Sequence, residues 1–443
     1  MRPTKKTLSY VLVLAALLMF AGLGGWYFFL NRQAETVSAT DASRGLRSEA
    51  PSRSVGNIYN NIVSGITSLV ERDGDETREG ASPPQLQKIT KTPVAGMAFG
   101  AGTSSVLYFA ESSTGYIFSA DTSTGAVERL TNRMFPKTQE AVFSRDGSVV
   151  LRSIDENGDI ASFAGKIATS TSSETVDGGA TLSGKYLERN ISAIVPAAFS
   201  RELLYIVKTP FGGADGILSS WDGMRRKTVF SSPLSGWYPI SLADGRIFFV
   251  LRPADNAAGF AYELKNGSLV PQVRDARGLT YLPNTSSAAI LYGESGGGSL
   301  ALFARAQNDA TSLSLPIRTV ADKCVWSTEG PAIATTTTPK IFSKKPAPMV
   351  KPLVAYCAVP QFVTSNAFLG DWYRGAIHTS DSWWRVDVSA DTVELIFAPE
   401  TDTPIDVESP IMDDRGEHIA FINAIDKTLW LLRIKPEKIK TTP

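Results

Sequence analysis

A short pattern recurs along the chain from residue 84 onward: an apolar strand, a turn that contains Asp or Gly, and a second, more strongly apolar strand. AVFSRDGSVVLRS, at 141–153, is its clearest copy. A repeat of about 40 to 45 residues that holds several strands is typical of a β-propeller, in which each repeat forms one four-stranded blade around a channel. Aligned on Phe143, the copies place equivalent residues at Phe99, Phe143, Phe199, Ser241, Leu282, Trp326 and Met412.

Two of the intervals between copies are longer than the others and contain inserted segments. The first holds the polar stretch 169–185, and the second holds a Thr/Pro/Lys-rich stretch at 331–350 and a further insert at 361–381. The second long interval contains four good strands and therefore counts as one blade. We expect an all-β, seven-bladed propeller over residues 84–436, followed by a short tail at 437–443.

The last repeat lacks one strand, because the chain turns polar and charged after residue 435. The segment PQLQKIT, at 84–90, precedes the first complete repeat, and its LQKIT resembles the VERLT of that repeat. We predict that this N-terminal strand completes the last blade. Such a closure would join the two ends of the ring and remove an exposed strand edge.

The chain contains only two cysteines, Cys324 and Cys357. They fall on the first and second predicted strands of the sixth blade, and antiparallel pairing of Val325 with Tyr356 would place them directly opposite each other. Cβ atoms of opposed residues lie close enough for a disulfide after modest adjustment. Two free buried thiols or half of a metal site are the alternatives. An extracytoplasmic location would favour the disulfide.

The N-terminal region predicts a membrane anchor. Residues 7–30 carry no charge and are largely apolar, which matches the roughly 20 residues that a helix needs to cross a bilayer. The run exceeds the apolar region of a cleavable signal peptide, so we favour an uncleaved anchor. The basic tip at 1–6 should stay cytoplasmic. Residues 31–83 read as an extracytoplasmic linker, which places the propeller outside the cytoplasm on a single-pass anchor in the cytoplasmic (inner) membrane.

Several motifs resemble known propellers. FSRDGS at 143–148, WDG at 221–223 and the repeat length resemble WD40-like propellers of the TolB type. TPVAGMAFG, KCVWS and DWYRGAIHTSDSWWRVD are similar to segments of membrane-anchored bacterial propeller proteins. The resemblance covers about residues 84–436 and implies the fold. It implies hardly any activity, because propellers host many unrelated functions.

The sequence argues against several classes of function. The formal net charge is zero, which leaves no basic surplus for nucleic acid. The two histidines, His378 and His418, lie far apart in sequence, so no metal site and no cofactor are expected. The G-x-S-x-G match at 293–297 joins two predicted strands and the acidic DENGD at 155–159 lacks the distal Glu of a calcium loop, so hairpin turns are predicted at both. The chain is therefore expected not to be an enzyme.

The insert at 361–381 supplies the candidate binding surface. Aromatic residues and Arg are enriched at interface hot spots, although buried rings could instead cap the blade core. We predict a binding or scaffolding module for an envelope protein, peptide or glycan, with the insert on the face opposite the 331–350 loop. A propeller enzyme acting on glycans at the channel mouth and a structural subunit of a secretion or pilus machine are the alternatives. The candidate residues are Phe368, Trp372, Tyr373, Arg374 and His378.

Overall fold

The computed structural model describes most of residues 84–434, and contacts divide the chain into units 1–81 and 82–443. The predicted anchor at 7–30, the linker at 31–83 and the tail at 437–443 lie outside the described residues. Among the residues that are described, no helix has the length and apolar character needed to cross a bilayer. The internal positions that are not described are 102–104, 169–180, 198–201, 252–253, 256, 307–310, 329–332, 335–348, 351 and 401.

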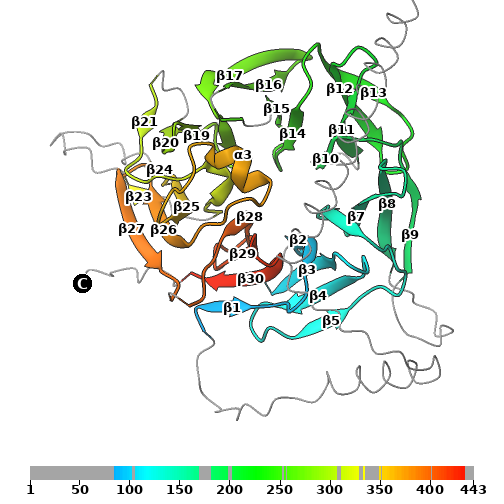
Figure 1. The fold of residues 1–443 in the computed structure, drawn as a ribbon, viewed down its shortest axis with the longest axis horizontal. Coiled ribbons are helices and arrows are strands. Elements are labelled where there is room, and N and C mark those ends of the chain that lie inside the picture. The colour runs from blue at the N-terminus through cyan, green and yellow to red at the C-terminus, as the bar shows by residue number, and fades with distance from the viewer. Residues whose placement is uncertain are drawn as a thin grey trace, which may run out of the picture. The chain divides into compact units, whose positions relative to one another are not determined.

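Seven four-stranded antiparallel sheets are arranged as blades around a central channel (Figure 1). The innermost strands are β2 (Val94–Phe99), β6 (Thr138–Phe143), β10 (Ala193–Ala197), β14 (Trp237–Ser241), β18 (Thr280–Pro283), β22 (Cys324–Trp326) and β28 (Val407–Met412). The second strands are β3 (Val106–Glu111), β7 (Ser148–Ile154), β11 (Glu202–Lys208), β15 (Ile247–Leu251), β19 (Ile290–Gly296), β25 (Val354–Pro360) and β29 (His418–Asn423).

The remaining strands complete each blade toward the outside. The third strands are β4 (Ile117–Asp121), β8 (Ile160–Ala168), β12 (Ala214–Ser220), β16 (Ala258–Lys265), β20 (Ser299–Arg305), β26 (Asp381–Asp387) and β30 (Thr428–Arg433). The outermost strands are β5 (Val127–Arg129), β9 (Thr181–Tyr186), β13 (Lys227–Ser232), β17 (Ser268–Arg277), β21 (Leu313–Ser314), β27 (Thr392–Phe397) and β1 (Leu86–Lys88). A two-stranded hairpin, β23 (Ile333–Ala334) with β24 (Met349–Val350), belongs to the loop between β22 and β25.

The ring closes as the sequence predicts. The N-terminal strand β1 pairs antiparallel with β30, with Leu86 opposite Leu432 and Lys88 opposite Trp430. The seventh blade therefore contains one strand from the start of the domain and three from its end, in the order β1-β30-β29-β28. A continuous ladder covers the edge that β30 would otherwise expose.

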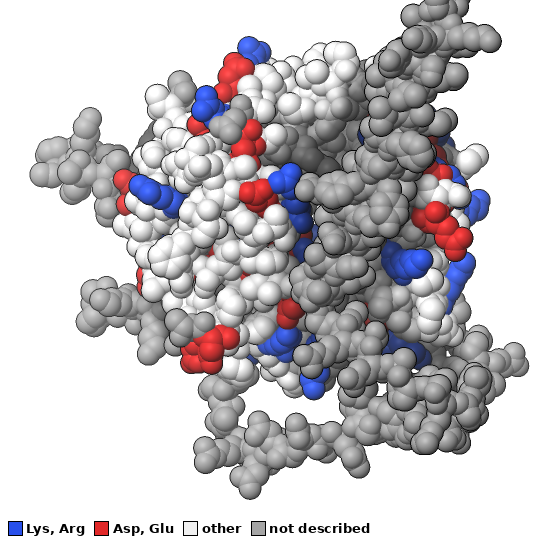
Figure 2. Space-filling view, in the orientation of Figure 1, with Lys and Arg blue, Asp and Glu red and all other residues white. Residues whose placement is uncertain are grey.

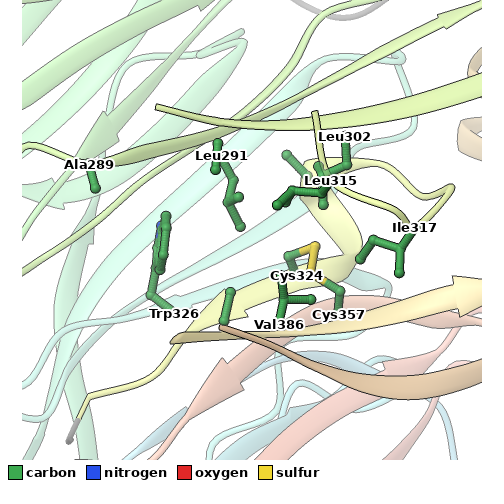
Figure 3. Close-up of a cluster of buried hydrophobic side chains, with 12 residues drawn as sticks. Ala289, Leu291, Leu302, Leu315, Ile317, Cys324, Trp326, Cys357 and Val386 are labelled. Carbon is green, nitrogen blue, oxygen red and sulfur yellow. A yellow bond between two sulfur atoms is a disulfide. The ribbon is translucent and has the colours of Figure 1, made fainter. Parts of the chain in front are cut away.

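The second strand of each blade is the most apolar because neighbouring blades cover both of its faces. Every residue of β29 is buried, and the first five residues of β7 are buried as well. A strand that is covered on both faces reads as a continuous apolar run rather than as an alternating one. This burial explains the stronger second half of the sequence repeat. One such inter-blade cluster surrounds Leu291, Trp326 and the two cysteines (Figure 3).

The repeat alignment agrees with the strands, with one correction. Phe99, Phe143, Ser241, Trp326 and Met412 end their innermost strands, and Leu282 lies one residue before the end of β18. Phe199 lies outside the described residues. The polar insert at 169–185 is shorter than predicted, because its last residues belong to the outer strand β9. Leu182 is the buried apolar residue of that strand. Because its neighbours in the sequence are polar, the sequence shows no strand pattern there.

Candidate functional site

The insert between β25 and β26 forms the short helix α3 (Phe368–Tyr373), which lies on one face of the ring beside the channel (Figure 1). Loops between second and third strands belong to this face, whereas β23 and β24 lie in a loop between first and second strands. In a propeller these two kinds of loop lie on opposite faces. The order of the strands therefore puts α3 and the β23–β24 hairpin on opposite faces.

The start of α3 is held by a carboxylate from another blade. Asp255, in the loop between β15 and β16, accepts hydrogen bonds from the backbone N–H groups of Leu369 at 3.2 Å and Gly370 at 2.8 Å. Ser295 of β19 donates its hydroxyl to the same carboxylate at 2.9 Å. The first N–H groups of a helix have no partner within the helix, so a carboxylate there satisfies and orients them. The insert of blade six is thus fastened to blades four and five.

The underside of α3 is apolar and buried. Phe368 is 1 % exposed and Trp372 is 6 % exposed, and both pack with Leu369, Leu300 and Val320. The prediction of an exposed binding residue is therefore wrong for Phe368, whereas Trp372, although mostly buried, lines the cavity beside α3. Their rings cap the core of the blade, which was the alternative reading of the insert. Burial of two large rings is what keeps this irregular segment in place.

A buried lysine lies beneath the insert. Lys323 ends the 3₁₀ helix η1 (Ala321–Lys323), and its side chain is fully buried. Its Nζ lies 2.6 Å from Oδ2 of Asp381 and 2.7 Å from Oδ1 of Asp406, and both carboxylates are fully buried. Thr379 and the carbonyl oxygen of Val407 complete its hydrogen bonds at 3.0 and 3.2 Å. A buried charge is tolerable only with such partners.

Three residues of the insert converge on Asp406. Trp372 donates its indole N–H to Oδ1 at 2.8 Å, Thr379 donates its hydroxyl to the same oxygen at 2.8 Å, and Nδ1 of His378 lies 3.0 Å from Oδ2. The Trp372 ring also faces the Lys323 ammonium, with 4.5 Å between Nζ and the ring centre. Asp406 therefore couples the position of the insert to the buried cation.

The two carboxyl groups differ in their pKa. The pKa of Asp381 is raised, because the effect of burial exceeds the lowering effect of the Lys323 charge. Burial acts on Asp406 in the same direction, but the Lys323 charge and the hydrogen bonds from Lys323, Thr379 and Trp372 together lower its pKa. Asp406 is thus the carboxylate that the site holds ionised most firmly.

A cavity of about 500 Å³ opens beside α3 at the channel mouth. Its polar lining includes Asp322, Tyr373, Arg374, His378 and the Glu408–Lys427 pair. Tyr373 is 45 % exposed and donates its hydroxyl to Oδ2 of Asp322 at 2.5 Å. Burial raises the pKa of the Asp322 carboxyl, and the Tyr373 hydrogen bond partly opposes that rise. Tyr373, Arg374 and, in part, His378 are the predicted residues that reach the surface.

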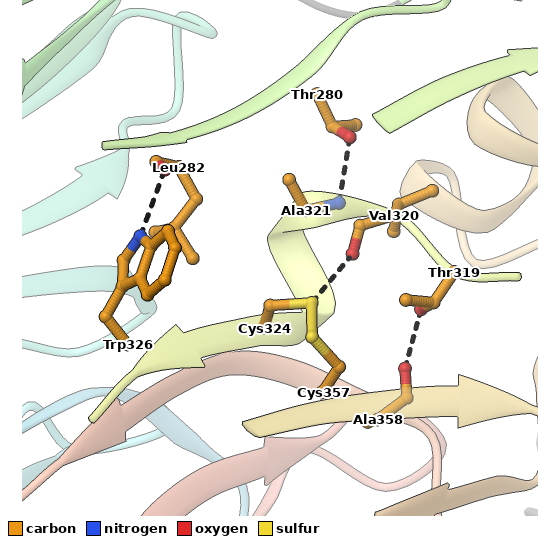
Figure 4. Close-up of a disulfide and its surroundings, with 9 residues drawn as sticks. All are labelled: Thr280, Leu282, Thr319, Val320, Ala321, Cys324, Trp326, Cys357 and Ala358. Carbon is orange, nitrogen blue, oxygen red and sulfur yellow. Dashed lines mark hydrogen bonds between the residues drawn. A yellow bond between two sulfur atoms is a disulfide. The ribbon is translucent and has the colours of Figure 1, made fainter. Parts of the chain in front are cut away.

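The cysteines form a disulfide that supports the same segment (Figure 4). Cys324 is opposite Cys357 and Val325 is opposite Tyr356, as the sequence predicts. Cys324 directly follows Asp322 and Lys323 in the chain. The bond therefore fixes the start of β22, directly after the 3₁₀ helix that presents Asp322 to the cavity and Lys323 to the buried cluster.

The acidic motif at 155–159, the G-x-S-x-G match at 293–297 and His418 all belong to the turns and strands of the blades. Asp155 to Asp159 form the hairpin turn between β7 and β8, as predicted. The 293–297 motif belongs to the hairpin of β19 and β20, but the strand extends through Gly296, so Ser295 lies in a ladder and not in the turn. His418 pairs with Asp413, 3.1 Å from Nδ1 to Oδ2.

The structure does not bring His378 and His418 together, because each contacts a different aspartate. Asp413, Glu417 and His418 offer ligand atoms within 4.8 Å of one another. Asp413, however, already accepts the backbone N–H groups of Glu417 and His418 at 2.8 and 3.2 Å. These contacts hold the turn between β28 and β29.

Sequence reasoning missed the residues that build the site, namely Asp255, Lys323, Asp381 and Asp406. One signal was present: Lys323 stands beside the apolar start of an innermost strand, where a charge is out of place unless it is paired. Its partners come from segments 58 and 83 residues further along the chain. No local pattern connects such positions.

Comparison with known proteins finds no matching family model and no match among curated proteins. Among solved structures, a streptogramin B lyase is similar at 13 % identity over 79 % of this chain and 97 % of its own, with a TM-score of 0.44. The WD40 domain of Neurospora crassa Pan2 is similar at 11 % identity over 80 % and 92 %, with a TM-score of 0.45. The propeller domain of the Trilobed protease from Pyrococcus furiosus is similar at 10 % identity over 77 % and 96 %, with a TM-score of 0.45. Likeness at this level carries no information about ligand or activity, and the assignment as a seven-bladed β-propeller rests on the seven sheets.

Proposed function

We propose that this propeller is a binding module whose recognition site is the cavity beside α3. The observation that carries the proposal is the way the insert is fixed. Asp255 holds one end of α3, and the buried cluster of Lys323 and Asp406 holds the other. An exposed aromatic ring and a guanidinium that are already ordered lose little freedom when a ligand binds.

The partner that we propose is a component of the cell envelope. This part of the proposal depends on the sequence, because residues 7–30 are expected to anchor the domain outside the cytoplasm. Acidic and basic side chains are interspersed over the described part of the α3 face (Figure 2). A mixed surface suits a protein, peptide or glycan better than nucleic acid, which calls for a basic stripe.

The test is capture of partners from detergent-solubilised envelopes with wild-type and variant protein. The variant combines Tyr373→Ala with Arg374→Ala. Tyr373 is 45 % exposed, and the side chain of Arg374 is 71 % exposed, so both can be removed without opening the core. Trp372 is unsuitable because its removal would disturb the buried cluster. Loss of two hot-spot residues should weaken capture by about 2 kcal/mol or more, which is about thirtyfold.

A deletion of residues 331–350 is the matched control, because that loop belongs to the opposite face. It should leave capture unchanged. The proposal is wrong if the loop deletion abolishes capture while the Tyr373/Arg374 variant retains it.

An enzyme that acts on glycans is the second candidate, and Asp322 favours it. A carboxyl group with a raised pKa at a cavity wall is the feature expected of a general acid. Glu408, paired with Lys427, lines the same cavity as a second carboxyl group, and glycoside cleavage uses two such groups. Asp322→Asn should abolish turnover of a cleaved glycan and leave its binding nearly intact. Equal turnover by the variant and the wild type would exclude Asp322 from this role.

A further inference from the structure

Three neighbouring blades are irregular at the same place. The pairing of the innermost strand with the second strand shifts after Val94 in β2, after Thr138 in β6 and after Glu408 in β28. These are blades one, two and seven, which are adjacent around the closed ring. In the other four blades, the described part of the corresponding pairing runs without a shift. A bulge redirects side chains and interrupts the ladder, and bulges are common beside functional sites.

The bulged residues line a second cavity of about 440 Å³. Ala95 comes from the bulge of β2, Gln139 from that of β6 and Ser409 from that of β28. Ser409 has a φ of 51°, in the left-handed region that a serine rarely adopts. Strain of this kind persists only where the surrounding structure enforces it, and it is concentrated at functional sites.

The two cavities are adjacent parts of one surface. Both are lined by Glu408, Ser409 and Lys427. The surface therefore runs from Tyr373 on the insert, past these three residues, to Gln139 in blade two. A ligand that fills both cavities must reach from Tyr373 in blade six past Glu408 to Gln139 in blade two, and an extended chain suits such a path better than a compact molecule does.

The charges of this surface are already neutralised by protein groups. Among the described residues that line the two cavities, each cation and anion contacts an opposite charge, except Asp322. Asp322 accepts the Tyr373 hydrogen bond, and a ligand hydroxyl could satisfy it as well as a cation could. The pairs are Glu408 with Lys427, Arg374 with Asp371, His378 with Asp406, and Glu140 with Arg152.

The aromatic groups point to the same kind of ligand. Tyr373 is half exposed, and its ring is held in place both by the ring of Trp372, 5.1 Å away between centres, and by the bond from its hydroxyl to Asp322. A fixed ring face is a platform for the C–H face of a sugar ring. The cavity also presents apolar groups, among them Leu282, Trp372 and Pro410, against which the C–H faces of a sugar can pack.

Resting on the proposed function, we infer that the channel mouth binds an uncharged oligosaccharide that extends from Tyr373 to the bulges of blades seven, one and two. One sugar stacks on Tyr373 and shares a hydrogen bond with Asp322. Sugars further along the chain contact Ser409 and Gln139. An acidic glycan gains little, because each described cation that lines the cavities already contacts a carboxylate.

The experiment titrates the full chain, purified in mild detergent, with neutral hexose and N-acetylhexosamine oligosaccharides from disaccharide to hexasaccharide. Oligogalacturonates of the same lengths supply the acidic comparison. Calorimetry is run on wild type, Tyr373→Ala, Tyr373→Phe and Gln139→Ala. Tyr186→Ala is the matched control, since Tyr186 is an exposed tyrosine at 63 % that does not line either cavity.

The expected result has three parts. A neutral hexasaccharide binds more tightly than a disaccharide. Tyr373→Ala weakens both by about tenfold or more, while Tyr373→Phe retains most of the affinity. Gln139→Ala weakens the hexasaccharide and leaves the disaccharide unchanged. The Tyr186 variant binds as the wild type does.

The inference is overturned if only acidic oligosaccharides bind, or if no neutral oligosaccharide binds, or if affinity does not depend on Tyr373. These results leave the proposed function standing when envelope capture still depends on Tyr373 and Arg374, and the captured partner is then a protein, a peptide or an acidic glycan. If capture is also insensitive to both residues, the proposed function fails together with the inference.

Discussion

Replacement of Lys323 by Met tests whether the buried cluster holds the insert in place. Met fills a similar volume but removes the cation that faces Asp381 and Asp406. Both carboxylates are 0 % exposed, so neither can be solvated without rearrangement. The Trp372 ring would also lose the ammonium that faces it at 4.5 Å.

The expected destabilisation follows from this burial. Breaking a buried ion pair by removing one partner costs about 3–5 kcal/mol, because the other charge is left uncompensated. The entropy of unfolding is about 2 cal/mol/K per residue, so a domain of roughly 350 residues should lose about 4–7 °C in melting temperature. The insert should loosen before the ring does, since Trp372, His378 and Thr379 all depend on Asp406.

The assay combines urea unfolding with limited trypsin digestion of the folded protein. Lys323→Met should lower the urea midpoint and expose the bond after Arg374 to cleavage. The matched control is the triple variant Lys323→Met, Asp381→Asn and Asp406→Asn, which removes all three charges together and should recover most of the loss. The argument is refuted if the single variant costs less than about 1 kcal/mol, or if the triple variant is no more stable than the single one.

The loss of stability caused by Lys323→Met should depend on pH. Because the folded state lowers the pKa of Asp406 below 3.8, its stabilisation is complete above that value and is lost as the pH falls through the folded-state pKa. Asp381, with a raised pKa, opposes this trend, since its ionised form is disfavoured by burial. The charged groups in contact with Asp406 are Lys323 and His378, and Lys323 in turn contacts Asp381. The difference between wild type and Lys323→Met should therefore shrink below about pH 4, and a constant difference down to pH 2 would contradict the assignment.

Three further outcomes are expected. Mass spectrometry of unreduced protein should find Cys324 linked to Cys357, and replacing both by Ser should cost about 3–4 kcal/mol for a closed loop of 33 residues; two alkylatable thiols in envelope-purified protein would refute the bond. Deletion of residues 84–90 should lower the melting temperature of the whole ring, whereas deletion of 32–80 should not, and equal melting of the two truncations would defeat the account of ring closure. Protease added to intact spheroplasts should digest the propeller if residues 7–30 anchor it with the domain outside, and protection of the domain would reverse the orientation.

The sequence by itself determined the fold of this protein. Second strands are covered by neighbouring blades on both faces and must therefore be continuous apolar runs. These runs, as in β29 and β7, make the repeat visible in the sequence. The closing strand at 84–90 was readable because the last repeat lacked one. The pairing of Cys324 with Cys357 was readable because register on two adjacent strands follows from local alternation.

Only the tertiary structure decided which residues of the insert face the ligand and which face the core. Phe368 and Trp372 look like surface anchors in the sequence, yet both pack into an apolar cluster with Leu300 and Val320, and Trp372 also donates to Asp406. Asp406 reaches Lys323 from 83 residues further along the chain, and Asp255 reaches α3 across two blades. Closure of the ring brings these segments together, and a repeat pattern carries no record of contacts between irregular loops. A chain's own periodicity therefore sets its strands, whereas a site built from loops depends on contacts that exist only after the blades have assembled.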